Sequence, residues 1–348
     1  MLERNFSRVR SRAPLRLGLA GGGTDVSPYC DLYGGAVLNA TIGLFAYTTI
    51  EPSIDGQIHF VALDQQVEEV FPITSVIQPG NRLELHRGVY NRAVQDFNEG
   101  NPLPVTIYTS CDAPAGSGLG SSSTLVVSML RAFAELLNAP LGEYDLAHLA
   151  YEVERKDVGL HGGRQDQYAA AFGGINFMEF SGDRILVNPL RIKESILCEL
   201  EASLVLFFTG QSRSSAAIIE EESRNVEEKN EIALTAMHHT KEQAFRMKDA
   251  LLRGQINTMG DVMRAAWEQK KLMARCISNR RIDHLYNLAT EKGAFCGKVS
   301  GAGGGGFMMF LAEPEKKLEV MRTLSDSGSG RVVECHFVMQ GASAWRPT

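Results

Sequence analysis

The spacing of hydrophobic residues divides the first half of the chain into strands and helices. β-Branched and aromatic residues are concentrated in four segments, which is typical of strands. These predicted strands cover 36–52, 58–64, 104–110 and 174–180. Apolar residues repeat at helical spacing in three other segments. These predicted helices cover about 87–98, 125–137 and 146–160. Asp55-Gly56 lies between the first two strands and predicts that they form a hairpin.

The second half is richer in helices, and its strands are short. The predicted strands are 204–210, the two arms of a strand–turn–strand segment over 298–313, and 331–338. The predicted helices are 215–253, 258–276, 279–292 and 315–324. The pattern changes near residues 180–190 without a long linker, so we expect two packed domains, 1–185 and 186–348. Helices and strands in both halves predict the α+β class.

Composition adds little to this picture except a class of partner that it excludes. The length of 348 residues suggests two domains at roughly 150 residues each, and 44% of the residues are hydrophobic. With 35 basic and 41 acidic residues the formal charge is −6, and nucleic-acid binding needs a basic surface instead. No segment approaches the roughly 18 apolar residues of a membrane span. We therefore expect a cytoplasmic protein that binds neither nucleic acid nor membrane.

The cysteines are too far apart to form a metal or redox motif. The closest two are 20 residues apart, so the chain lacks the C-x-x-C pair of a zinc ribbon or a redox dithiol. Dispersed cysteines in a long chain predict reduced and buried thiols. The six are Cys30, Cys111, Cys198, Cys276, Cys296 and Cys335.

A glycine- and serine-rich loop, APAGSGLGSSST over 113–124, leads directly into the predicted helix 125–137. Glycines let backbone N–H groups approach an anion, and a helix N-terminus carries free N–H groups and a partial positive charge. A phosphate can bind there without a lysine or an arginine. The hydroxyls can cap the helix, or one can reach a Mg²⁺ that the phosphate holds. A plain glycine turn followed by serine caps is the alternative.

Better-known nucleotide motifs do not fit this chain. The nearest approach to a Walker A motif, over 293–299, has the wrong spacing and ends in Val299. The protein-kinase motifs H-R-D and D-F-G are absent. The glycines of 301–306 match G-x-G-x-x-G, but a strand-like segment follows where a dinucleotide fold needs a helix. We expect this second glycine cluster to support the loop 113–124 or to cover a substrate.

Charged residues stand beside glycine turns in two places. Arg16 ends a predicted strand and Asp25 follows the triple glycine 21–23. An arginine there can orient a carboxylate and favour its charged form, although a weak surface ion pair has the same pattern. Glu154 and Asp166 flank a second glycine turn and can divide metal binding and proton acceptance between them. Solvated charges are the alternative for this pair.

Taken together, these motifs resemble the GHMP kinase superfamily, which includes galactokinase, homoserine kinase and mevalonate kinase. Three motifs stand in the family's order, APLRLGLAGGGTD over 13–25, PAGSGLGSSS over 114–123 and KVSGAGGGGF over 298–307. The resemblance implies a two-domain α+β fold. The first half would be like domain 2 of ribosomal protein S5, and the second ferredoxin-like. The glycine-rich AGGGTDVSPY and the segment TGQSRSSAAII resemble the branch that phosphorylates the anomeric hydroxyl of D-glycero-D-manno-heptose 7-phosphate.

The resemblance implies a role for individual residues, with ATP and Mg²⁺ as cofactors. Asp166 would be the catalytic base and Arg16 would lie beside it. Ser122 and Glu154 would hold Mg²⁺, and Arg213 is a candidate for binding a phosphate already on the substrate. The implied ATP-binding residues are Pro114, Gly116, Ser117, Gly118, Leu119, Gly120, Ser121, Ser122 and Ser123. The implied substrate-binding residues are Gly22, Gly23, Thr24, Asp25, Arg213, Gly303 and Gly304.

Two other functions stay open at this point. The first is a different sugar 1-kinase on the same scaffold, for which the fucokinase-like branch is the nearest candidate. Galactokinases carry Gly-Glu-His where this chain has the triple glycine 21–23, which argues against galactose. The second is a catalytically silent sensor of nucleotide and sugar, against which the intact Ser122, Glu154 and Asp166 speak. The heptose-phosphate kinase and the alternative sugar kinase would each bind ATP with a sugar phosphate or a sugar, and each would act as a monomer or a homodimer.

Overall fold

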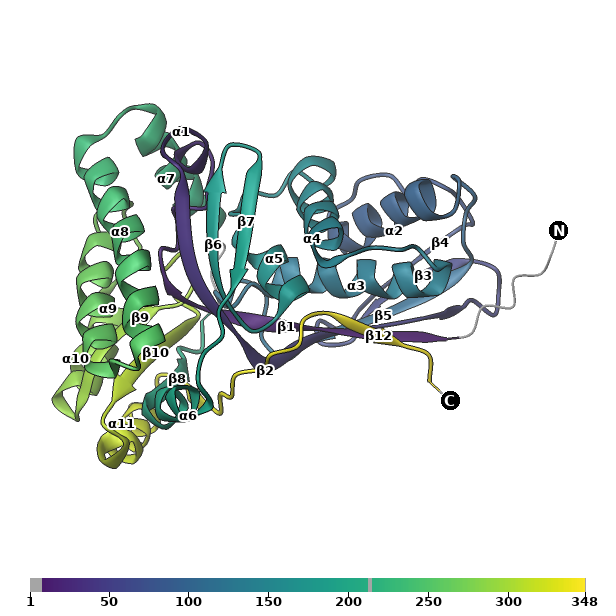
Figure 1. Ribbon diagram of the computed structural model, residues 1–348. Helices are drawn as coiled ribbons and strands as arrows, with labels where there is room; N and C mark the ends of the chain where they lie inside the picture. Colours follow the sequence, from purple (N-terminus) through teal and green to yellow (C-terminus); the bar gives the residue numbers. More distant parts are fainter. Residues whose placement is uncertain (1–7, 212–214, 348) are drawn as a thin grey trace.

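The first half of the molecule is a long, mostly antiparallel sheet with helices on one face. The computed structural model describes residues 8–211 and 215–347, and in these the sheet has the order β12-β1-β2-β5-β3-β4, with β6 attached to β2 and β7 attached to β6 (Figure 1). The strands are β1 Val9–Ala20, β2 Gly35–Pro52, β3 Ile58–Ala62, β4 Val67–Phe71, β5 Val105–Cys111, β6 Ile175–Ser181, β7 Arg184–Pro189 and β12 Ser343–Trp345. The helices are α1 Tyr29–Tyr33, α2 Glu84–Phe97, α3 Ser121–Leu137, α4 Glu143–Glu152 and α5 Gln165–Phe172.

The second half is a smaller antiparallel sheet with the order β11-β8-β10-β9. Its strands are β8 Leu204–Phe208, β9 Ala294–Val299, β10 Phe307–Ala312 and β11 Arg331–Val333. Its helices are α6 Glu194–Ser203, α7 Ala216–Glu227, α8 Glu231–Arg253, α9 Ile256–Lys270, α10 Arg280–Glu291 and α11 Pro314–Asp326. The mixture of helices and strands in both halves confirms the predicted α+β class.

A shared hydrophobic core joins the two halves. One cluster of buried residues combines Leu17 of β1 and Leu38 of β2 with Met247 of α8 and Met263 of α9. Burial of apolar surface is the main favourable term in folding, so this cluster fixes the two halves relative to each other. The chain end strengthens the connection, because β12 returns from the second half and pairs with β1 (Figure 1). The expected boundary between residues 185 and 186 falls inside β7, a strand of the first sheet.

The predicted hairpin at Asp55-Gly56 is wrong. The strands β2 and β3 on either side of this turn do not pair, because β5 lies between them, antiparallel to β2 and parallel to β3. The strand β4, which pairs with β3, was also not predicted. The long helix predicted over 215–253 is two helices, since Asn230 caps α8 by accepting a hydrogen bond from the Ala233 amide.

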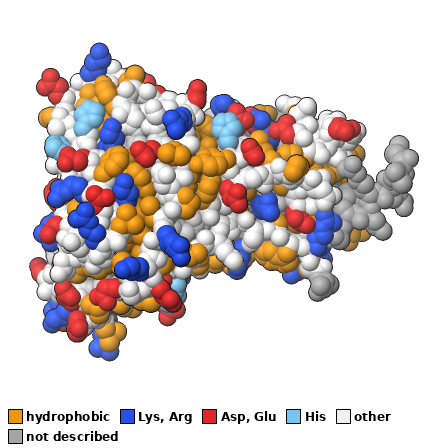
Figure 2. All heavy atoms as spheres, in the orientation of Figure 1, with side chains coloured by type: hydrophobic (Ala, Val, Ile, Leu, Met, Phe, Trp, Pro, Cys, Tyr) orange, Lys and Arg blue, Asp and Glu red, His pale blue; other side chains and the backbone are white. Residues whose placement is uncertain are grey.

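The surface carries charges of both signs. On the face shown in Figure 2, Lys and Arg side chains are interspersed with Asp and Glu over the second half, with apolar groups between them. This face therefore has no stripe of basic residues. Among the described residues, no helix is both long enough and apolar enough to cross a membrane. The six cysteines are free, but Cys198 and Cys276 are exposed, so the prediction that all six are buried is wrong.

Candidate functional site

A cleft of about 300 Å³ lies between the two halves and contains most of the predicted residues. Four stretches of the first half line it, from β1 and the turn after it, the start of α3 with the loop before it, the π-helical turn and the loop that follow α4, and the start of α5. The second half contributes residues of α7, α9, β9 and the glycine loop after β9. The charged residues that line the cleft are Arg16, Asp25, Glu154, Arg155, Asp166, Glu222, Lys270 and Lys298.

The first glycine loop presents a bare helix N-terminus to this cleft. Gly120 is the residue before α3 and has a φ of 77°, a left-handed conformation that suits glycine. No side chain caps the helix, so the serine caps considered above do not form. The first N–H groups of a helix have no partner within it and carry a partial positive charge. The start of α3 therefore offers free N–H groups to the cleft, and the binding of an anion by residues 116–123 stays a prediction.

The second glycine cluster fixes the shape of the first. The Ser300 hydroxyl donates to the Gly118 carbonyl at 2.9 Å, and the Phe307 amide donates to the Ser117 carbonyl at 2.9 Å. A Cβ on Gly118, where φ is 83°, would lie 2.2 Å from the Ser300 carbonyl oxygen. Only glycine permits this approach of two backbones. This contact confirms the expectation that the cluster 301–306 supports the first loop.

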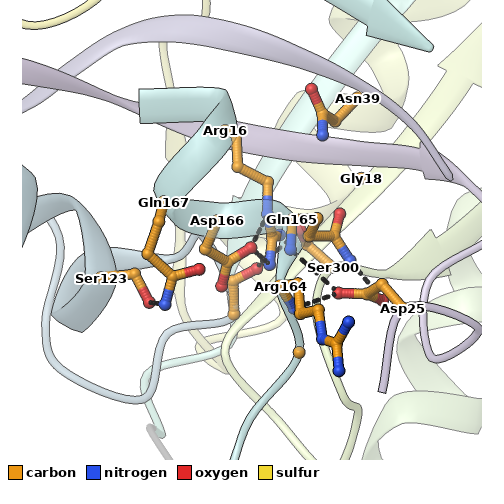
Figure 3. A network of polar contacts seen from close by, with 12 residues as sticks. Arg16, Gly18, Asp25, Asn39, Ser123, Arg164, Gln165, Asp166, Gln167 and Ser300 are labelled. Carbon is orange, nitrogen blue, oxygen red and sulfur yellow. Dashed lines mark hydrogen bonds and ion pairs between the residues drawn. The ribbon is translucent and has the colours of Figure 1, made fainter. Parts of the chain in front are cut away.

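Arg16 and Asp166 form an ion pair at the floor of the cleft. The Arg16 Nε and Nη2 atoms contact Asp166 Oδ1 at 2.7 and 2.6 Å, and Nη1 donates to the Gly118 carbonyl at 2.8 Å (Figure 3). The register of β1 shifts between Pro14 and Arg16, and the Arg16 amide bonds to the Leu119 carbonyl instead of β2. Such irregularities re-aim a side chain. Because Arg16 uses Oδ1, the second oxygen of Asp166 keeps no contact with the arginine.

Asp25 fixes the start of the helix that carries Asp166. Its carboxylate accepts hydrogen bonds from the Arg164 and Gln165 amides at 3.0 and 3.1 Å, from Gln165 Nε2 at 3.0 Å and from the Gly23 amide at 3.2 Å (Figure 3). A carboxylate accepts about four hydrogen bonds, so these contacts use its capacity. Asp25 lines the cleft, but the role it plays in this structure is to hold the first turn of α5.

Glu154 lies on a wide helical turn behind the first glycine loop. The turn Val153–Asp157 is π-helical, a form that often marks functional sites. Glu154 is buried, and its Oε2 accepts from the Ser123 hydroxyl and from Gln167 Nε2, both at 2.6 Å. The hydroxyl in contact with this carboxylate is thus that of Ser123, and the Mg²⁺ role implied for Ser122 and Glu154 stays a prediction. Ser122 and Glu154 both line the cleft.

Some predicted residues do not reach the cleft. Thr24 is fully buried, and its hydroxyl donates to the carbonyls of Gly21 in the same turn and of Ala36 in β2, at 2.8 and 3.0 Å. Gly304 bonds to Ile277 instead. Contact of either with a ligand is therefore not supported. In the first loop, the residues that hold the backbone rather than line the cleft are Pro114, Ser117 and Leu119. Arg213 lies outside the described residues.

Three buried charged residues that the second half contributes to the cleft were not predicted, because they come from separate helices and strands. Lys298 of β9 and Lys270 of α9 are buried and donate to the Gly18 and Gly22 carbonyls at 2.7 and 3.1 Å. Glu222 of α7 is buried beside them. Lys298 lies within a quoted motif, and its position directly before a glycine cluster was the one available signal. The positive charges of Arg16, Lys270 and Lys298 suit anionic ligands.

Burial of Lys298 has a consequence for stability. Burial, together with the charges of Lys270 and Arg16, lowers the pKa of Lys298 to about 7. The charged form therefore opposes folding fully below pH 7, and this cost falls as the pH rises from 7 toward the unfolded pKa near 10.5. We expect Lys298→Met to raise the Tm, and to raise it more at pH 6 than at pH 9, in thermal denaturation. Lys292→Met, at an exposed site after α10, should show no such difference; an equal gain at both pH values would contradict the assignment.

Comparison with known proteins finds similarity along the whole chain. Two family models match, "GHMP kinases N terminal domain" over residues 85–174 and "GHMP kinases C terminal" over residues 247–329. A D-glycero-alpha-D-manno-heptose 7-phosphate kinase from Campylobacter jejuni is 46% identical over 339 residues, which cover 97% of this chain and 99% of that protein. A bifunctional fucokinase/GDP-fucose pyrophosphorylase from Arabidopsis thaliana is 27% identical over 90% of this chain and 31% of that protein.

Solved structures agree with these matches. The crystal structure of a D-glycero-D-manno-heptose 1-phosphate kinase from Bacteroides thetaiotaomicron has a TM-score of 0.83 and 45% identity, covering 98% of this chain and 99% of that one. The structure of Lactococcus lactis galactokinase in complex with galactose has a TM-score of 0.74 at 16% identity, covering 98% of this chain and 95% of that one, and shows the shared fold alone. The similarity therefore includes both halves and the cleft between them.

Proposed function

This chain belongs to the GHMP kinase family, and within that family we propose that it transfers the γ-phosphoryl group of ATP to the anomeric hydroxyl of D-glycero-D-manno-heptose 7-phosphate. The product is the 1,7-bisphosphate. The observation that carries this proposal is the Arg16–Asp166 pair, which faces the bare N-terminus of α3 across one cleft. The 46% identity to a heptose 7-phosphate kinase supports the choice of sugar.

We propose one task for each side of the cleft. The N–H groups at the start of α3, with the loop 116–123, bind and orient the phosphates of ATP. The acceptor hydroxyl attacks the γ-phosphorus, its proton goes to the free oxygen of Asp166, and the bond to the β–γ bridging oxygen breaks to release ADP. Arg16 holds Asp166 and the loop carbonyl of Gly118 at once. It therefore keeps the base at a fixed distance from the phosphate loop.

The side chains near the start of α3 fit a Mg²⁺ ion. Mg²⁺ prefers oxygen ligands and uses only one or two carboxylates together with the phosphates of its nucleotide. Glu154 and Ser122 supply a carboxylate and a hydroxyl beside the phosphate loop. We propose that these two residues hold the ion, with Ser123 and Gln167 orienting the carboxylate. When bound, Mg²⁺ neutralises charge on the transferred group.

A second cavity suits the nucleoside part of ATP. It has a volume of about 330 Å³ and shares Ser121, Ser122 and Leu160 with the margin of the first cleft. Its walls include Leu83, Leu125 and other apolar groups, and ligand pockets for aromatic rings are mostly apolar. A nucleotide with its base in this cavity would direct its phosphates toward the start of α3.

The proposed substrates are water-soluble metabolites, so we place the reaction in the cytoplasm.

An ADP-release assay across a panel of sugars tests the proposal. We expect the highest kcat/KM with D-glycero-D-manno-heptose 7-phosphate, and product analysis should place the new phosphate on C1. The panel should include free L-fucose, D-galactose and mannose 6-phosphate. Turnover of free fucose without turnover of the heptose phosphate would assign the chain to the fucokinase-like activity of its Arabidopsis relative. No ADP release with any sugar, together with nucleotide binding, would indicate a sensor.

A further inference from the structure

A buried carboxyl group and a buried ammonium group face the same end of the cleft from the second half. Glu222 is 1% exposed and lies on the inner face of α7, one helical turn from Ile218 and from Val226. Lys270 is 4% exposed and ends α9. Both residues line the cleft. They come from different helices, so the fold alone brings them together.

Glu222 lacks the partners that a buried carboxyl group normally has. Its Oε1 atom makes no hydrogen bond within the described part of the chain. Burying a polar atom without a partner costs free energy, and such exceptions in a native protein call for an explanation. Burial raises the pKa of Glu222 to about 7, with Lys270 opposing this shift and Asp25 and Glu221 adding to it. The packing of α7 thus maintains a costly group at the wall of the cleft.

The glycines after β1 lie directly beside this pair. A Cβ on Gly23 would lie 2.6 Å from Met273 Cε and 3.5 Å from both carboxyl oxygens of Glu222, and a Cβ on Gly22 would lie 3.9 Å from Lys270 Nζ. A side chain at Gly22 would therefore point at Lys270, and one at Gly23 would collide with Met273 beside Glu222. Lys270 has three N–H donors, and the Gly22 carbonyl accepts from this ammonium group. A ligand resting on the Gly22–Gly23 turn meets one strong acceptor and one strong donor.

We propose that Glu222 and Lys270 form a clamp that determines sugar specificity, in which the carboxylate accepts hydrogen bonds from neighbouring ring hydroxyls and the ammonium group donates to a sugar oxygen. The ligand class is a pyranose with adjacent hydroxyl groups. This inference rests on the proposed sugar-kinase function and adds the residues that read the acceptor. Asp25 does not serve as well, because its oxygens are occupied by the start of α5.

The test compares Glu222→Gln and Lys270→Met with matched changes on the same helices. Glu221→Gln removes a charge one residue away, where the side chain faces Arg275 at 3.8 Å. Lys271→Met does the same beside Lys270, where the side chain pairs with Glu268. We expect each clamp variant to raise the KM for the heptose phosphate roughly ten- to hundredfold, the loss of one charged hydrogen bond. The KM for ATP should stay unchanged, and the control variants should behave like the wild type.

Sugars that lack one hydroxyl make the test specific. Among the 2-, 3- and 4-deoxy analogues of the best acceptor, at least one should bind to the wild type as weakly as the full sugar binds to Glu222→Gln. The Glu222→Gln variant should bind that analogue and the full sugar with nearly equal affinity, because the hydrogen bond is already lost. Unchanged sugar KM values in both clamp variants, or equal losses for sugar and ATP, overturn the inference. If another acceptor proves best, the proposed heptose activity fails. The clamp is then judged by the same measurements on that acceptor, so the two failures are distinguishable.

Discussion

Asp166→Asn is expected to lower kcat by about 10²–10⁴-fold, the usual contribution of a general base, while the affinity for ATP stays nearly unchanged. Asparagine has the shape of aspartate and keeps an oxygen for Arg16, so the floor of the cleft should persist. It does not accept the proton of the attacking hydroxyl at neutral pH. The ATP affinity should persist because the nucleotide phosphates are proposed to bind to the start of α3, whereas Asp166 belongs to α5.

Turnover measured by ADP release, with ATP affinity from calorimetry, separates these two effects. Asp145→Asn is the matched control, because Asp145 also lies in the first turn of a helix, α4, and is exposed there. It should keep the wild-type rate. A wild-type rate in Asp166→Asn would remove Asp166 from the role of base. A parallel loss of ATP affinity would instead assign it to nucleotide binding.

The elements that the sequence predicted well are those whose signal is local. The helix α3 and the strand β2 follow from apolar spacing over more than ten consecutive residues. The failed hairpin shows the limit of such signals. Asp55 does make a tight turn, with hydrogen bonds from Ser53 and from the Gln57 amide. The turn does not decide which strands pair, however. The strand β5, which is distant in sequence, lies between β2 and β3 and pairs with both of them.

The same distinction applies to the site. The phosphate loop was predicted from glycines and serines that are adjacent in sequence, whereas the Arg16–Asp166 pair, 150 residues apart, was given only by the family resemblance. Glu222 and Lys270 had no such signal. Each looks like an ordinary charged residue of a helix, and such residues are usually solvated. Their burial depends on how α7 and α9 pack against the Gly22–Gly23 turn, which is tertiary information. Asp25 was predicted to be a residue of the site, but its four hydrogen bonds around the start of α5 were not predicted.

The contacts of Arg16 lead us to expect a larger effect of its removal than a single ion pair suggests. It is almost fully buried and joins three parts of the site, Asp166, the Gly118 carbonyl and, through its own amide, the Leu119 carbonyl. An arginine presents its donors in a rigid planar fork, so these distances are fixed together. The base and the phosphate loop are thus positioned by one side chain.

Arg16→Met is therefore expected to lower kcat by roughly 10²–10³-fold, as the loss of a preorganised donor does, with little change in the KM for either substrate. Arg16→Lys should fall between this variant and the wild type, because lysine keeps the charge but not the fork. Since Arg16 acts partly by holding Asp166, the double variant with Asp166→Asn should be hardly slower than Asp166→Asn alone. Arg12→Met, on the same strand but lying over the Phe45 ring, is the control. Losses that multiply in the double variant, or a raised KM at an unchanged kcat, would show that Arg16 and Asp166 act separately.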